Sequence, residues 1–167
     1  MKLVRPDDYL EFAIEAAHAA GRLTLGYFQA GVRPDMKPDD TPVTVADRKA
    51  EELIRERIGR RFPDHRIVGE EFGCKEGDPS APCWWIDPID GTKAFVRGVP
   101  LYAVLLGLEA AGRIVAGVAY FPALDEMVYA ADGTGCFLNG RRCAVSAVET
   151  LSRAVVSFTN AASFKKE

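Results

Sequence analysis

The chain has 167 residues, a formal net charge of −3 and a hydrophobic content of 48%. This length suits one folded domain with a real core, and the slightly acidic balance gives no basic surface for nucleic acid. No apolar run approaches the roughly 20 residues that cross a bilayer, and residues 1–6 lack the apolar core of a secretory signal. The four cysteines show no C-x-x-C spacing, so the sequence predicts reduced thiols and a cytoplasmic protein.

A long amphipathic helix is predicted near the N-terminus. Asp7 and Asp8 follow a proline, as at a helix start, and apolar residues then recur at helical spacing as far as Phe28. His18 borders that apolar stripe and is expected to be structural or exposed rather than a ligand. Gly31 is expected to end the element. A helix with one apolar face of this kind is expected to cover a sheet.

A second helix is predicted to begin at Thr44. Thr44 and Asp47 have the spacing of a capping box, in which each side chain bonds a backbone N–H group of the other residue. Spacing alone is equally consistent with Asp47 serving only as a cap. Apolar residues continue through Ile58, and arginines on the other faces are expected to form a solvated surface. These arginines are Arg55, Arg57, Arg60 and Arg61.

A short strand at residues 66–69 is predicted to carry Glu70 and Glu71 at its tip. Because side chains alternate along a strand, Glu71 is expected to point away from Glu70 if the strand extends that far. Residues 73–82 contain Gly, Pro and Ser and predict a loop.

The chain is organised around residues 84–95, where an apolar strand expected to be buried enters an acidic turn and then a helix. The proline after Asp87 cannot donate to a sheet ladder, so pairing is expected to stop at Asp87. Gly91 permits a tight turn, and N–H groups from Thr92 onward form a ready anion site. Asp87 and Asp90 beside this cradle suit Mg²⁺. An isolated Asp-Pro-x-Asp-Gly run is also typical of a structural acidic turn.

The rest of the chain predicts an antiparallel meander. Its strands are expected at residues 101–109, 114–121, 127–130, 135–138 and 141–143. Asn139-Gly140 is a strong two-residue hairpin turn. A sheet covered by two helices predicts the α+β class. Residues 1–150 are expected to form a metal-binding domain, and residues 151–167 are expected to begin a second, truncated domain with a strand at 155–159.

Three segments carry a resemblance to a known family. Residues 40–47 run Asp-Thr-Pro-Val-Thr-Val-Ala-Asp, residues 68–73 run Val-Gly-Glu-Glu-Phe-Gly, and residues 87–92 run Asp-Pro-Ile-Asp-Gly-Thr. In order and approximate spacing these segments resemble the metal-dependent phosphatases of the inositol monophosphatase family, and the last is highly specific to it. The resemblance reaches to about Thr159. It implies the layered αβαβα sandwich of that family, here without its C-terminal half.

The resemblance implies a phosphate monoester hydrolase that uses Mg²⁺, with Mn²⁺ as a substitute. Glu70, Asp87 and the carbonyl of Ile89 would hold one ion, and Asp87 would bridge to a second ion that Asp90 also binds. Asp47 would be an accessory metal ligand. Two such ions about 3.5–4 Å apart neutralise phosphate charge, position an in-line water and stabilise the leaving group.

The same resemblance assigns the catalytic and phosphate-binding roles. Glu70 with Thr92 would orient the attacking water, and the backbone of Gly91 and Thr92 would grip the phosphate oxygens. Glu71 would be structural or would support the metal ligands from outside. Residues 93–102 resemble the bacterial histidinol-phosphatase branch, which implies histidinol phosphate as the substrate and a role in histidine biosynthesis. Inositol 1-phosphate, fructose bisphosphate and sulfated nucleotide 3′-phosphates are the alternatives.

Two other motifs are excluded by spacing. Haloacid-dehalogenase phosphatases carry Asp-x-Asp-x-Thr near the N-terminus, and a calcium loop starting at Asp87 would need Glu where Gly98 stands. A non-catalytic metal- or phosphate-binding module stays open, because the family's site is completed by a Trp-Asp segment that this chain lacks. The chain alone is therefore expected to turn over poorly. Its expected partner is a small phosphorylated molecule, without nucleic acid or membrane, and a homodimer is left open.

Overall fold

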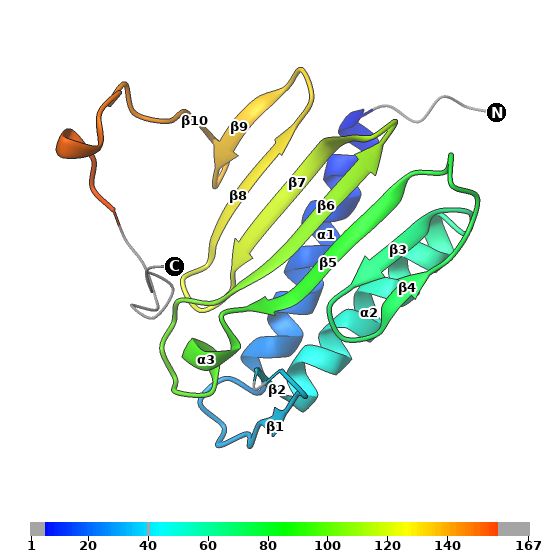
Figure 1. The fold of residues 1–167 in the computed structure, drawn as a ribbon, viewed down its shortest axis with the longest axis vertical. Helices are drawn as coiled ribbons and strands as arrows, with labels where there is room; N and C mark the ends of the chain where they lie inside the picture. Colours follow the sequence, from blue (N-terminus) through cyan, green and yellow to red (C-terminus); the bar gives the residue numbers. More distant parts are fainter. Residues whose placement is uncertain (1–5, 40, 157–167) are drawn as a thin grey trace.

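The computed structural model describes residues 6–39 and 41–156. Two long helices, α1 (Pro6–Leu25) and α2 (Val45–Arg61), lie side by side along one face of a large sheet (Figure 1). A separate small sheet pairs β1 (Asp35–Met36) with β2 (Pro42–Val43) in the segment that joins the two helices. The α+β class predicted from the sequence is confirmed.

The large sheet has eight strands. They are β3 (Arg66–Gly69), β4 (Gly73–Lys75), β5 (Cys83–Asp90), β6 (Ala103–Ala110), β7 (Arg113–Phe121), β8 (Glu126–Ala131), β9 (Gly135–Leu138) and β10 (Arg141–Cys143). Their order is β10-β9-β8-β7-β6-β5-β3-β4. The meander from β6 to β10 is antiparallel as predicted, and β5 pairs antiparallel with β6. The sheet is mixed rather than only antiparallel, because the chain turns back through β4 before it enters β5, which leaves β3 and β5 parallel.

The main core lies between the helices and the sheet. Alanines on the sheet-facing side of α1 are at most 1% exposed; they are Ala13, Ala16, Ala17 and Ala20. Such small side chains let the helix approach the sheet closely, and a Cβ on Gly21 would stand 2.5 Å from the ring of Tyr120. Trp84 is fully buried, and its indole Nε1 donates to His65 Nδ1 over 3.1 Å. This packing fixes β5, whose end carries the acidic turn.

A second, smaller core explains why α1 ends earlier than predicted. The helix stops at Leu25, and the chain continues in hydrogen-bonded turns with φ of 58° at Gln29. The ring of Phe28 then packs 5.7 Å from the ring of Phe95 and 5.3 Å from that of Tyr102. The last apolar residues of the predicted stripe therefore belong to a cluster around α3 (Thr92–Phe95), not to the helix.

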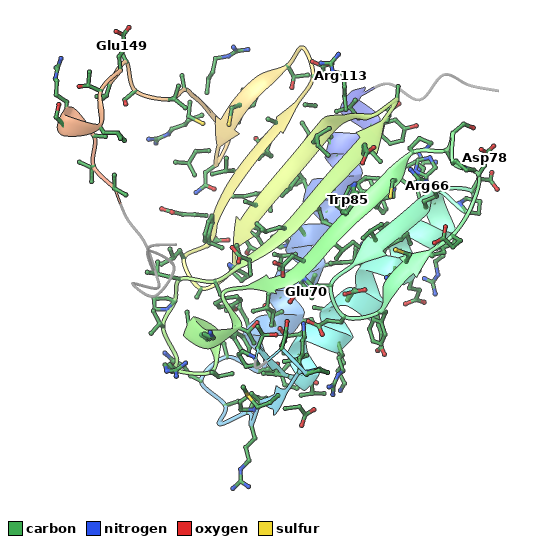
Figure 2. The ribbon with its side chains drawn as sticks, viewed as in Figure 1. Arg66, Glu70, Asp78, Trp85, Arg113 and Glu149 are labelled. Atoms are coloured by element: carbon green, nitrogen blue, oxygen red, sulfur yellow. The ribbon has the colours of Figure 1, made fainter. Side chains whose placement is uncertain are left out.

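The face of the sheet opposite the helices carries an open apolar groove of about 750 Å³. Because side chains alternate along β5, Trp85 lies on this face and is 45% exposed, so the prediction of a buried strand was wrong for this residue (Figure 2). Ile114 on β7 is also exposed on this lining. The groove reaches Glu70 and Asp87 at one end.

The C-terminal part of the described chain is less regular. Asn139 and Gly140 have φ of 48° and 78°, which is the two-residue turn predicted between β9 and β10. A single turn of 3₁₀ helix, η1 (Leu151–Arg153), follows. In the strand predicted at 155–159, Val155 and Val156 are exposed and outside any strand, and 157–159 lie outside the described residues. No helix of the described chain is long and apolar enough to span a membrane.

Candidate functional site

Parallel pairing of β3 with β5 brings two acidic residues together at the C-terminal ends of these strands. This end of the two strands is called the sheet edge below. Gly69 is paired with Ile86 in this register, and the next residues along each strand are Glu70 and Asp87. The backbone N–H of Glu70 donates to the carbonyl of Ile86 over 3.1 Å. The two carboxylates therefore lie side by side at the ends of neighbouring strands. The parallel pair that brings them together was not predicted from the sequence.

Asp87 lies in a strongly acidic environment. Burial, then the charge of Glu70 and a hydrogen bond with it, then the charge of Asp90 raise the pKa of Asp87 to about 8. The backbone N–H of Ile89 donates to Asp87 Oδ1 over 3.1 Å and opposes that shift in part. The structure therefore brings Glu70, Asp87 and Asp90 into electrostatic contact, and without a cation their environment favours the protonated form of Asp87.

The acidic turn keeps its place through an irregularity in β5. The prediction that pairing stops at Asp87 was wrong. After a break in register, Asp90 is again paired with Ala103 on β6. Pro88 lies in that break, where no ladder donor is required of it. The side chain of Ile89 is buried in the smaller core and anchors the turn there. Asp90, the next residue, stays exposed.

Gly91 and Thr92 open α3 directly after the turn. Gly91 has φ of 93°, and a Cβ there would stand 3.0 Å from the carbonyl oxygen of Leu101, so another residue at this position would be strained and crowded. The hydroxyl of Thr92 lies 3.2 Å from Asp47 Oδ1 and 3.1 Å from the carbonyl oxygen of Ile89. Thr92 thereby links the acidic turn to the start of α2.

The capping box predicted at the start of α2 is confirmed. Asp47 Oδ2 accepts hydrogen bonds from the backbone N–H of Thr44 over 2.8 Å and from its hydroxyl over 2.5 Å. Burial raises the pKa of Asp47, and the hydrogen bonds from Thr44 and Thr92 counteract part of that shift. Asp47 is thus the third helical residue of the capping box, and its other carboxylate oxygen faces Thr92.

We expect Thr44→Ala to lower the free energy of unfolding by about 1 kcal/mol, because the change removes a side-chain cap at a buried helix start. Urea titration measures the effect. Thr150→Ala is the matched control, since Thr150 precedes η1 without a side-chain capping bond. Equal losses in the two variants would contradict the capping role.

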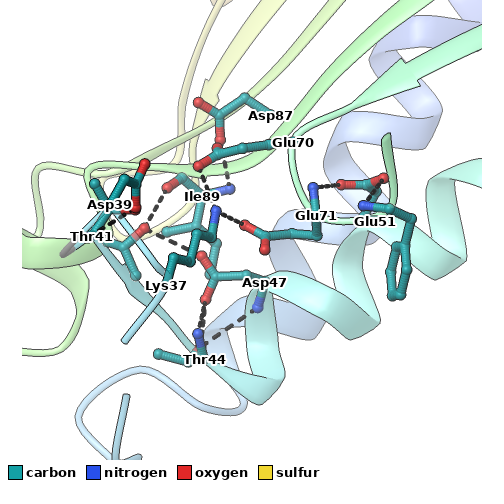
Figure 3. Close-up of polar contacts among 12 residues, drawn as sticks. Lys37, Asp39, Thr41, Thr44, Asp47, Glu51, Glu70, Glu71, Asp87 and Ile89 are labelled. Atoms are coloured by element: carbon teal, nitrogen blue, oxygen red, sulfur yellow. Dashed lines mark hydrogen bonds and ion pairs between the residues drawn. The ribbon is translucent and has the colours of Figure 1, made fainter. Parts of the chain in front are cut away.

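Lys37 is a member of the cluster that the sequence analysis missed. Its ammonium donates to Glu70 Oε1 and to Glu71 Oε1, each over 2.8 Å (Figure 3). Burial acts to lower the pKa of Lys37, but the bonds to both carboxylates outweigh it and raise this pKa. The pKa of Glu71 is raised by burial. The expectation that Glu71 points away from Glu70 required the strand to extend that far, and this condition is not met. β3 ends at Gly69, so strand alternation does not extend to these residues.

Glu51 was also missed, and it corrects the prediction for Arg55. The Arg55 guanidinium is not simply part of a solvated surface, because its Nε donates to Glu51 Oε1 over 2.7 Å. Both side chains stand one helical turn apart on the face of α2 that carries Asp47. The sequence did hold a signal for the burial of Glu51. This charged residue lies four positions after Asp47, on a helix face that also carries apolar residues such as Ala50 and Ile54.

The donor chemistry of the cluster fits a hard divalent cation. The predicted ligands Glu70, Asp87, Asp90 and the Ile89 carbonyl all present oxygen, which Mg²⁺ and Mn²⁺ prefer. Within the described residues, no three Asp, Glu, His or Cys side chains already stand in metal-binding geometry. Glu70 is instead drawn toward Lys37. The residues therefore fit the ion in type.

Comparison with known proteins identifies the family of this chain. The model of the inositol monophosphatase family matches residues 5–166. A histidinol-phosphatase of Chlorobaculum parvum is 48% identical over 151 residues, which is 90% of this chain and 58% of the relative. An inositol-1-monophosphatase of Rhizobium meliloti is 44% identical over 149 residues, which is 88% of this chain and 56% of the relative. The chain thus spans little more than half the length of these relatives.

Solved structures agree with the sequence comparison. The extragenic suppressor protein suhB of Bartonella henselae superimposes with a TM-score of 0.79 at 38% identity, over 84% of this chain and 55% of that one. An IMPase of Thermotoga maritima gives a TM-score of 0.78 at 37% identity, over 84% of this chain and 54% of that one. From the family model and these relatives together, the chain belongs to the inositol monophosphatase family.

Proposed function

We propose that the chain is the metal-binding part of a phosphate monoester hydrolase that uses Mg²⁺ or Mn²⁺. The observation that carries the proposal is the meeting of Glu70, Asp87 and Asp90 at one sheet edge, directly before the turn at Gly91. Carboxylates beside a backbone anion site are the arrangement that binds a phosphate through divalent cations. Family membership supports the same conclusion.

In this proposal Glu70, Asp87 and the Ile89 carbonyl would hold one ion, while Asp87 and Asp90 would hold a second. Asp47 would be an accessory ligand through the oxygen that faces Thr92. When bound, the ions neutralise phosphate charge and lower the pKa of the attacking water. The raised pKa of Asp87 supports this assignment, because a nearby divalent cation would drive the proton off a carboxyl group that burial and the neighbouring carboxylates keep protonated.

The chain's own residues would then orient the reactants. The Thr92 hydroxyl lies within hydrogen-bonding distance of Asp47 and of the Ile89 carbonyl, and it would direct a water together with Glu70. The first N–H groups of a helix point out beyond its N-terminus, so the backbone of Gly91 and Thr92 would bind phosphate oxygens. Without a Cβ at Gly91 the phosphate can approach the backbone closely.

We further propose that residues 1–150 form the first domain and that residues 151–167 begin a second. The apolar groove beside Trp85 and Ile114 supports this division, because an exposed apolar patch of that kind marks a surface for another protein layer. The second layer would complete the pocket for a small phosphorylated substrate in the cytoplasm. A non-catalytic binding module is the alternative, and an assay for phosphate release in the completed protein separates the two.

We propose histidinol phosphate as the substrate. The support is the run of residues 93–102 together with the name of the Chlorobaculum parvum relative. The expected result is a higher kcat/KM for histidinol phosphate than for inositol 1-phosphate, measured with residues 1–150 joined to a C-terminal domain of the family. A ratio that favours inositol 1-phosphate would assign the protein to the other branch. Release of phosphate from neither substrate would favour a different phosphate ester.

A further inference from the structure

We propose that Glu51 is a positioning residue that fixes the Glu70–Glu71 turn for metal binding. The inference rests on the proposed metal site and adds a residue to it that lies outside the family's metal-binding motifs described above. Its carboxylate does not enter the predicted ligand set. It acts on the backbone that carries Glu70.

The carboxylate of Glu51 is bonded to the chain on the far side of Glu70. Its Oε2 accepts from the backbone N–H of Glu71 over 2.7 Å, and its Oε1 accepts from the backbone N–H of Phe72 over 3.2 Å. The side chain is 0% exposed. A buried carboxylate that accepts two successive backbone N–H groups fixes the direction of the chain at that point.

Contact on the near side of Glu70 is equally close. A Cβ added to Gly69 would stand 1.9 Å from Glu51 Oε1, so the carboxylate occupies the space that any larger residue at position 69 would need. Glu51 therefore touches the residue before Glu70 and the two residues after it. Close approach, rather than an unusual backbone angle, explains the glycine at this position.

The burial of Glu51 is compensated by charge. The guanidinium of Arg55 donates to Glu51 Oε1 over 2.7 Å from one helical turn away, and it also bonds the carbonyl of Gly73. A buried carboxylate without such partners would be costly. The pair therefore clamps the turn from both ends, between Gly69 and Gly73, and anchors it to the rigid helix α2.

Glu70 depends on that clamp for the position of its backbone. Its side chain is 44% exposed and bonds the ammonium of Lys37, the end of another long side chain. Its position relative to Asp87 is therefore set by the backbone of the turn. A metal ligand whose supporting contacts are lost typically binds its ion 10–100-fold more weakly.

Isothermal titration of Mg²⁺ into the 167-residue chain and its Glu51→Gln variant tests the inference. Gln keeps the size of the side chain but turns an N–H donor toward a backbone donor. We expect a Kd about 10–100-fold higher in the variant. We also expect faster hydrogen exchange at the amides of Glu71 and Phe72, because Gln offers one acceptor oxygen where Glu51 offers two.

Two further variants separate positioning from general instability. Ile58→Val removes a methyl group from the same helix in the buried core, and it should leave the Kd for Mg²⁺ unchanged. Arg55→Lys keeps the charge but loses the guanidinium geometry, so a several-fold rise in Kd is expected even where Glu51→Gln fails to fold.

The outcomes distinguish this inference from the proposed function. Failure of the unmodified chain to bind Mg²⁺ would overturn the metal site and this inference together. Binding by the unmodified chain with an unchanged Kd in the Glu51 or Arg55 variant would overturn this inference alone. An equal loss of affinity in Ile58→Val would also overturn it, because the effect would then follow stability rather than the turn.

Discussion

Replacing Asp87 and Asp90 together by Asn is expected to abolish Mg²⁺ binding and, at the same time, to stabilise the chain without metal. Both effects follow from the burial and close spacing of the carboxylates at the sheet edge. Burial first, and then Glu70 and Asp90, raise the pKa of Asp87 to about 8. Removing the charge removes the repulsion and, with it, the ligands that a cation would use. A gain on the order of 2 kcal/mol is expected above pH 8.

The pH dependence follows from the sign of the shift. The ordinary pKa of Asp is 3.8, and the folded value is about 8. Between these values the folded chain binds more protons than the unfolded chain, so the free energy of unfolding of the metal-free chain falls as pH rises. Above pH 8 the Asp87 contribution stays at its minimum. In the double variant this part of the slope disappears.

Urea titrations at pH 5, 7 and 9 with a metal chelator measure the stability, and calorimetry measures the Kd for Mg²⁺. Asp132→Asn is the matched control, since that exposed aspartate pairs with Arg113 away from the sheet edge. It should change neither the slope nor the Kd. Equal Mg²⁺ affinity in the double variant and the unmodified chain would remove Asp87 and Asp90 from the site.

Local sequence was enough to predict the parts of the site that are close in the chain. The capping box at Thr44 and Asp47 and the turn at Gly91 each depend on residues within a few positions of one another. Such features follow from short-range backbone chemistry. The meander and its Asn139-Gly140 turn were predicted for the same reason.

Long-range features could not be derived in the same way. Lys37 lies far in sequence from Glu70, and nothing local marks it as a partner of two carboxylates. The parallel pairing of β3 and β5 depends on the three-residue strand β4, which is too short and polar to stand out. The clamp formed by Glu51 requires α2 to pack against that same turn. Each depends on tertiary placement rather than on periodicity.

The exposed apolar face leads to the prediction with the largest effect on activity, that the 167-residue chain alone turns over poorly. The groove reaches Glu70 and Asp87 and is lined on its other sides by apolar residues such as Trp85, so it offers few polar groups to a substrate. Asp87 and Asp90 also give a second ion few protein ligands. A displacement of the reacting groups by ~1 Å costs on the order of 10²-fold in rate.

The test compares the chain with a chimaera in which residues 1–150 are followed by the C-terminal part of the Chlorobaculum parvum relative, which is 48% identical over the shared region. Under saturating Mg²⁺ we expect the chain alone to bind one ion, through Glu70, Asp87 and the Ile89 carbonyl, with kcat at least about 10²-fold below that of the chimaera. A chimaera with both Asp87 and Asp90 replaced by Asn should be inactive. This control ties the measured rate to the sheet edge. Matching kcat values for the chain and the chimaera would contradict this prediction, because catalysis would then proceed with the apolar face uncovered.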